Sequence, residues 1–220
     1  MKRKQEINDL VKVDNFIDFN KNIKTNDKTF EKLMFIYKVA IKELETKIEI
    51  LQEEAKVLYD YDLIDHTNTR IKSPDSIIEK MNKKGCKLTY QEMIENINDI
   101  AGVRVICSLK KDIFVIRDLV EKIPGVHILK QKDYITHPKK SGYSSYHLIV
   151  EVPIVLSRQI VYVKVEIQIR TVAMDFWASL EHKMKYKPEE NIDNKSSKEW
   201  VKTAKIIEQL DKKMMLLNNC

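Results

Sequence analysis

Glycine is scarce in this sequence: only 4 of the 220 residues are Gly, whereas an average protein contains about 7%. No two glycines lie closer than 17 positions apart, the spacing of Gly85 and Gly102 and also of Gly125 and Gly142. The sequence therefore contains neither GxxxxGK(S/T) nor GxGxxG, the loops with which many proteins bind phosphates. Any phosphate bound here must be held by cationic side chains and metal instead.

Cysteines and long hydrophobic runs are also scarce. Cys86, Cys107 and Cys220 are odd in number and lack metal-site spacing, which indicates reduced thiols in a cytoplasm. No apolar run approaches the length of about 18 residues that a membrane span needs, and the first thirty residues contain no signal-peptide pattern. With 43% hydrophobic and 33% charged residues, the chain is predicted to be a soluble globular protein of one domain, or of one domain with helical additions.

Positive charge is plentiful and unevenly distributed, within a formal net charge of +6. Residues 70–87 carry six Lys and Arg against two acidic residues, and residues 130–140 carry four Lys against one Asp. This concentration favours an anionic ligand, either a nucleotide or a nucleic acid. Two solvated lysine-rich faces explain the charge alone equally well.

Hydrophobic periodicity and capping residues divide the chain into helices and strands. Apolar residues at steps of three and four predict a long helix over 28–58, whose apolar stripe is either core or a subunit contact. Ser73 and Pro74 begin a short helix that Gly85 ends, and Thr89 with Glu92 begins another. The other predicted elements are helices over 111–123, 171–185 and from Ser196 onward, and strands over 103–109, 126–135, 146–152 and 160–169. Helices around a mixed sheet define an α/β or α+β fold.

The strand over 160–169 is the most informative element. Valine and isoleucine occupy its odd positions, and period-two geometry places them in the core. Its other face carries Tyr162, Lys164, Glu166, Gln168 and Arg170. This face is either the solvated side of an antiparallel sheet or the floor of a site where a carboxylate among cations binds a metal ion and phosphates.

Two other segments could complete such a site. Asp99 lies where a helix meets a strand; it is either a simple turn residue or, with Glu166, the carboxylate pair that Mg²⁺ prefers. Residues 137–147 form a loop with lysines and tyrosines that could clamp phosphates and stack on a base. A surface hairpin is the alternative for this loop.

Five separated motifs occur in order between residues 66 and 187. They are Arg70-Ile71-Lys72 with Ser76, Asp99-Ile100-Ala101-Gly102-Val103-Arg104, Ser141-Gly142-Tyr143 with Tyr146-His147, Glu166-Ile167-Gln168-Ile169-Arg170-Thr171, and Phe176-Trp177-Ala178-Ser179-Leu180-Glu181-His182. Together they resemble the small alarmone synthetases, the stand-alone synthetase branch of the RelA/SpoT homologues. The resemblance is specific because all five motifs agree in sequence and in order.

The resemblance implies a nucleotidyltransferase-like fold, a mixed β-sheet flanked by helices, and a Mg²⁺-dependent reaction. Pyrophosphate would move from ATP to the 3′-hydroxyl of GDP or GTP, giving (p)ppGpp and AMP. Residues 28–187 would form the synthetase domain, with a polar arm over 1–27 and a linker and helix over 188–220. Family members often form homotetramers through their outer helices, and we expect the same here, with no hydrolase domain ahead of the motifs.

By motif position, the resemblance also assigns a role to each site residue. Asp99 and Glu166 would be catalytic and would ligate Mg²⁺, and Glu166 would take the proton from the 3′-hydroxyl. Arg70 and Arg104 would hold adenine between them. The ATP phosphates would be bound by Lys72, Ser76, Lys80 and Lys83. The guanine nucleotide would be bound by Lys139, Tyr143, His147, Gln168, Arg170 and Asp175, with Tyr143 stacked on guanine and with Lys139 and His147 facing the phosphates.

The chain also departs from the family pattern. Ser144 stands where family members often have Arg, and Asp175 stands where many have Asn, close to the expected position of guanine. These departures leave the preference for GDP or GTP open. His182 lies on the same helix face as Asp175, but we expect it to be structural, and we expect Trp177 and Leu180 to be core.

Two other functions remain compatible with the sequence. One is a catalytically inactive regulator that binds a nucleotide or single-stranded RNA with the same basic surface. The other is a nucleotidyltransferase with a different acceptor. A membrane partner is not expected.

Overall fold

The computed structural model describes residues 28–157, 159–185 and 194–218. The predictions made for residues 1–27, for the part of the linker over 188–193 and for Cys220 lie outside these ranges. The strands are β1 (His66–Ile71), β2 (Ala101–Cys107), β3 (His127–Asp133), β4 (Tyr146–Val155) and β5 (Ile160–Thr171). They form one sheet in the order β1-β2-β5-β4-β3, in which β2 and β5 are parallel and the other pairs are antiparallel. The predicted mixed sheet is confirmed.

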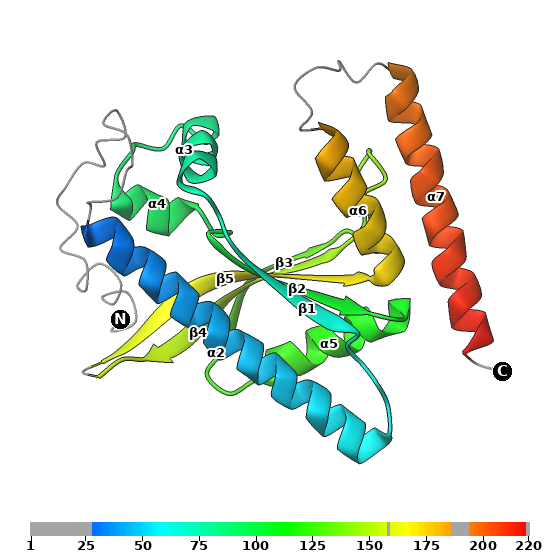
Figure 1. Cartoon of the computed structure of the whole chain (residues 1–220), viewed down its shortest axis with the longest axis horizontal. Helices are drawn as coiled ribbons and strands as arrows, with labels where there is room; N and C mark the ends of the chain where they lie inside the picture. The colour runs from blue at the N-terminus through cyan, green and yellow to red at the C-terminus, as the bar shows by residue number, and fades with distance from the viewer. Residues whose placement is uncertain (1–27, 158, 186–193, 219–220) are drawn as a thin grey trace.

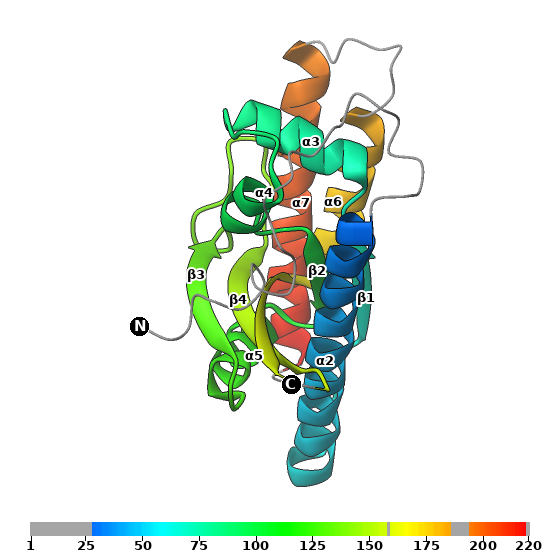
Figure 2. The same cartoon turned by 90° about the vertical axis from the view of Figure 1, so that its left-hand side faces the viewer.

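Helices flank this sheet on both faces. They are α2 (Lys28–Tyr59), α3 (Pro74–Lys83), α4 (Tyr90–Asn96), α5 (Lys110–Lys122), α6 (Val172–Lys185) and α7 (Asn194–Leu217). Figure 1 shows α2 and α5 on one face, α3 and α6 rising from the other, and α7 beside α6; Figure 2 shows α3 across one end of the molecule. Among the residues that the structure describes, no helix is long and apolar enough to span a membrane.

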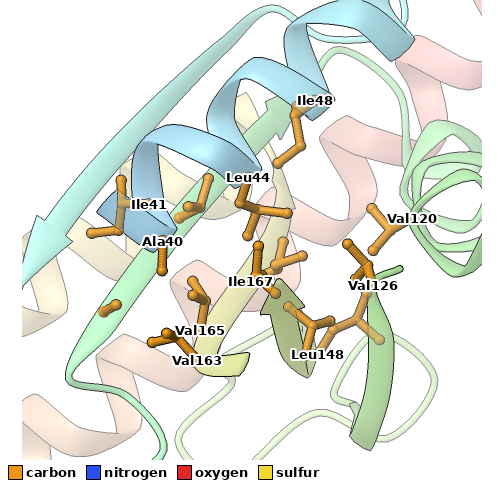
Figure 3. Packing of buried hydrophobic residues seen from close by; sticks show 14 of the residues in the cluster. Ala40, Ile41, Leu44, Ile48, Val120, Val126, Leu148, Val163, Val165 and Ile167 are labelled. Atoms are coloured by element: carbon orange, nitrogen blue, oxygen red, sulfur yellow. The ribbon is translucent and has the colours of Figure 1, made fainter. Parts of the chain in front are cut away.

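The core lies between α2 and the sheet. Figure 3 shows Leu44 and Ile48 of α2 above Val165 and Ile167 of β5, and all four side chains are buried. The apolar stripe of α2 is therefore core, as its periodicity predicts. The alternative, a subunit contact through these residues, is wrong because their own sheet already covers them. Only the last member of the stripe, Leu58, is exposed, at 61%.

Helix ends agree with the capping residues in part. The Ser73 hydroxyl accepts a hydrogen bond from the Ser76 N–H at 3.3 Å, and Gly85 follows α3 with φ +67°, a conformation that favours glycine. Thr89 caps α4, but Asn96 donates to the Glu92 carboxylate, so no bond from Glu92 to Thr89 completes the capping box. The predicted N-cap at Ser196 is wrong, because α7 begins two residues earlier, at Asn194. Residues 194 and 195 are Asn and Lys, which are compatible with the start of a helix.

Strand β1 is the element that sequence patterns did not predict. Its sequence, HTNTRI, has no apolar alternation, and most of its side chains are exposed. It lies at the edge of the sheet and pairs with β2 alone. Backbone pairing rather than burial holds it in place, so hydrophobic periodicity carries no signal for it. Strand β2 also begins two residues before its predicted start at Val103.

Candidate active site

Three cavities adjoin on the sheet face opposite α2. The largest, about 570 Å³, lies between α3, the sheet and α6. A second cavity of about 480 Å³ runs along the start of α3, and a third of about 160 Å³ lies over β1 and β2. Arg70 lines all three, Arg104 lines the first and the third, and Lys80 lines the first and the second. The cavities thus form one branched cleft lined by positively charged side chains.

Asp99 lies in this cleft, in the turn between α4 and β2. Its Oδ2 accepts hydrogen bonds from the ammonium groups of Lys80 at 2.6 Å and Lys72 at 3.1 Å. Burial raises the pKa of Asp99, but the two lysines outweigh this effect and bring the pKa below its ordinary value. Its Oδ1 is buried and has no hydrogen-bond partner among the described residues. A buried carboxylate oxygen without a partner is unusual and marks a position for a ligand.

Glu166 projects from the middle of β5, and its side chain is 13% exposed. Its Oε1 lies 3.1 Å from Nδ1 of His147, and its Oε2 accepts a hydrogen bond from Nε2 of Gln168 at 2.8 Å. Nη2 of Arg70 lies 3.7 Å from Oε2. Burial raises the pKa of Glu166, but the hydrogen bonds from His147 and Gln168 outweigh it, so the pKa lies below its ordinary value. Glu166 is therefore held ionised and in a fixed orientation.

His147 and Tyr143 form the opposite wall of the cleft. Nε2 of His147 lies 2.8 Å from the Tyr143 hydroxyl, which accepts a hydrogen bond from Nη2 of Arg170 at 2.6 Å. Because the Glu166 carboxylate can only accept, Nδ1 of His147 carries a proton and Nε2 accepts from Tyr143. Burial lowers the pKa of His147, which agrees with a neutral ring. The Lys139 ammonium lies 4.5 Å from the centre of the Tyr143 ring.

Two arginines share the carboxylate of Asp175 on α6. Its Oδ1 lies 2.9 Å from Nη1 of Arg170 and 3.1 Å from Nη1 of Arg104. Arg170 also donates to Oε1 of Gln168 at 2.9 Å. These contacts connect the cavity over β1 and β2 with the wall that carries Tyr143.

The loop before β4 is supported by α7. Gly142 has φ +90°, and a Cβ atom at this position would overlap Cβ of Ala204 on α7. Only a glycine fits this close approach with this backbone conformation. The position of Tyr143 therefore depends on how α7 packs against the loop.

The structure brings nearly all of the predicted site residues into this cleft. The cavities are lined by Asp99, Glu166, Arg70, Lys72, Ser76, Lys80, Lys83, Arg104, Lys139, Tyr143, His147, Gln168 and Arg170. Asp175 lines none of these three cavities and instead contacts Arg104 and Arg170. Asp99 and Glu166 line the same cavity, and their pairing as Mg²⁺ ligands stays a prediction.

Several residues of the cleft were missed or misjudged from the sequence. His182 was expected to be purely structural, but it lines both larger cavities; its shared helix face with Asp175 was the signal that could have identified it. Leu180 was expected to be core and is 38% exposed, because it lies on the outer side of α6, whereas Trp177 is buried as predicted. Asn68 lines the smallest cavity and was missed because β1 was missed.

The mixed sheet, its flanking helices and the cation-lined cleft define a protein of the nucleotidyltransferase-like class. A family model described as "Region found in RelA / SpoT proteins" matches residues 69–191. The chain therefore belongs to the RelA/SpoT family, and the resemblance seen in its motifs is confirmed.

Individual relatives agree with this assignment. The chain is 43% identical to the GTP pyrophosphokinase YwaC of Bacillus subtilis over 88% of its own length and 92% of that protein. Its structure is similar to that of small alarmone synthetase 2 of Bacillus subtilis, with a TM-score of 0.79, 42% identity and coverage of 87% and 99% of the two chains. It is also similar to small alarmone synthetase 1 of the same organism bound to its product pppGpp, with a TM-score of 0.80, 33% identity and coverage of 88% and 98%.

Proposed function

We propose that this protein is a (p)ppGpp synthetase that transfers pyrophosphate from ATP to the 3′-hydroxyl of GDP or GTP and releases AMP. The observation that carries the proposal is the cleft, in which two ionised carboxylates lie among converging lysines and arginines. The similar proteins named GTP pyrophosphokinase and the similar structure bound to pppGpp support it.

ATP would occupy the two cavities near α3 and β1. Adenine fits the smallest cavity, where Arg70 and Arg104 supply flat cationic groups that stack on a base. The second cavity, lined by Lys72, Ser76 and Lys83, would take the phosphates. Lysines suit this task because each ammonium group is a compact charge with three donors.

Mg²⁺ would bind between the two carboxylates. The unpartnered Oδ1 of Asp99 and the nearby Glu166 fit an ion that accepts one or two protein carboxylates and fills its octahedron with water and phosphate oxygens. The described residues contain no group of three or more His, Cys, Asp or Glu suited to a metal, so most ligands would come from substrate and solvent. Bound Mg²⁺ would neutralise charge on the phosphate oxygens.

Glu166 would act as the base for the acceptor. Its carboxylate takes the proton of the 3′-hydroxyl while the hydroxyl oxygen forms a bond to the β-phosphorus of ATP. The bond between that phosphorus and the oxygen bridging to the α-phosphate breaks, and AMP leaves with the electron pair. A pKa below the ordinary value keeps Glu166 ionised at neutral pH. His147 would orient the Glu166 carboxylate in addition to facing the acceptor phosphates.

The direct test is an assay with ATP, Mg²⁺ and either GDP or GTP. We expect AMP and a guanine nucleotide carrying a 3′-pyrophosphate, and loss of both products when EDTA removes the metal. A panel of other acceptor nucleotides serves as the control, since preferred transfer to one of them would mean a different nucleotidyltransferase. Binding of both nucleotides with no product would favour a regulator.

We also propose a cytoplasmic homotetramer. The apolar residues Ile206, Leu210 and Met214 of α7 are at least 43% exposed in the single chain, and a second copy would cover them. Light scattering at micromolar concentration tests this, and a monomeric mass would contradict it.

Whether the lysines at 130–140 bind single-stranded RNA is tested by a gel shift at two salt concentrations.

A further inference from the structure

Asp175 stands between two parts of the site, and an arginine from each part contacts its carboxylate. Arg104 lines the cavity over β1 and β2 and contacts Oδ1 of Asp175. Arg170 contacts the same oxygen through Nη1 and uses Nη2 to hold the Tyr143 hydroxyl. A continuous series of polar contacts thus runs from the adenine cavity, through Asp175, to the tyrosine expected to stack on guanine.

The charge of Asp175 is what allows the two guanidinium groups to lie together. Burial lowers the pKa of Arg104, the neighbouring Arg170 lowers it further, and Asp175 opposes both effects. The Arg170 side chain is only 5% exposed, so water screens the repulsion between the two arginines weakly. A neutral side chain at position 175 would leave that repulsion uncompensated.

We propose that Asp175 is a positioning residue that couples the two nucleotide sites, so that each nucleotide binds more tightly when the other is bound. Adenine on Arg104 fixes this arginine against Asp175, which in turn fixes Arg170 and Tyr143. A guanine nucleotide that binds next meets an ordered wall and loses less conformational entropy. Thermodynamic linkage makes the effect reciprocal. This inference rests on the proposed function, because it takes ATP and a guanine nucleotide as the ligands.

The test measures the dissociation constant of GDP by calorimetry, with and without saturating α,β-methylene-ATP and Mg²⁺. In the wild-type protein we expect the analogue to tighten GDP binding by about fivefold or more. In Asp175→Asn we expect this ratio to approach about 1, and Asp175→Glu, which keeps the charge, should retain part of it. Asp118→Asn is the matched control, because it removes another Arg–Asp pair, Arg117–Asp118, at an exposed position outside the cleft.

Each outcome decides the question. A ratio near 1 in the wild type, or an unchanged ratio in Asp175→Asn, overturns the coupling. If Asp175→Asn unfolds at the assay temperature, the two ratios are compared at a lower temperature at which the variant is folded, and the same two outcomes decide. Coupled binding without any product contradicts the proposed function and leaves the coupling standing, whereas failure to bind either nucleotide overturns both.

Discussion

The two faces of β5 differ in chemistry: one is apolar and buried, and the other is polar. The face toward α2 consists of Val161, Val163, Val165, Ile167 and Ile169, all completely buried. The other face carries Lys164, Glu166, Gln168 and Arg170. Each of these side chains forms a hydrogen bond with another residue. Apolar contacts are non-directional and depend on area, whereas each polar contact depends on one partner at one distance. The first face should therefore govern stability and the second should govern activity.

The sharpest test of this difference is Glu166→Gln on the polar face. The substitution keeps the shape of the side chain and removes its charge, so we expect the catalytic rate to fall by about 10²–10³-fold or more, with little loss of thermal stability. The measurement is AMP formation, with Tm from thermal unfolding. Glu151→Gln on the neighbouring strand β4, outside the three cavities, is the control and should retain its activity. Full turnover by Glu166→Gln would exclude Glu166 as the base.

The opposite test is Ile167→Ala on the apolar face. Loss of a fully buried side chain beneath α2 should lower the free energy of unfolding by about 2–5 kcal/mol. The rate per folded molecule should change far less than in Glu166→Gln. Denaturant unfolding measures the first quantity. Ile160→Ala, at a position of the same strand that is 52% exposed, should cost much less, and equal losses at the two positions would break the comparison.

Gly142→Ala tests a contact on which both stability and activity are expected to depend. The new Cβ atom would overlap Ala204, and φ is +90°, so we expect a loss of about 1–3 kcal/mol. The KM for the guanine nucleotide should rise while the KM for ATP does not, because the displaced loop carries Tyr143. Gly125→Ala is matched to it, with φ +81° and a Cβ atom 3.1 Å from Pro153, and should cost stability without changing either KM.

The smallest effect is expected from Asp211→Asn, where a polar side chain serves stability alone. Thr171, the last residue of β5, donates to the buried Asp211 carboxylate at 3.0 Å. Burial raises the pKa of Asp211 above its ordinary value of 3.8, so Asp211 holds its proton more tightly in the folded protein than in the unfolded one. Its contribution to stability therefore falls as the pH rises from 3.8 through the higher pKa of the folded state. Asn does not titrate, so the variant should gain a few degrees of Tm relative to the wild type toward neutral pH.

A pH series of thermal unfolding checks this prediction. The gain should vanish at low pH, where Asp211 is protonated in both the folded and the unfolded state. A gain for Asp211→Asn that is constant at all pH values would contradict a titration of Asp211.

Local patterns predicted much of the fold and of the site. The alternation along β5 predicted both of its faces, Ser73 and Pro74 marked the start of α3, and the motifs identified the lining of the cleft. Strand β1 was not predictable, because an edge strand without a buried face has no hydrophobic period. The contacts of Asp175 were not predictable for a different reason: its partners Arg104 and Arg170 come from other elements, and sequence spacing carries no information about such contacts.

The sequence by itself determined which residue types would meet phosphates: with 4 glycines in 220 residues, lysines and arginines had to do so. It also determined which face of each strand would be apolar, because side chains alternate along an extended backbone. Only the tertiary structure decided that Lys72 and Lys80 share one oxygen of Asp99 and leave the other without a protein partner. It alone decided that two arginines share Asp175, because a shared ion pair depends on where separate elements cross rather than on their order along the chain.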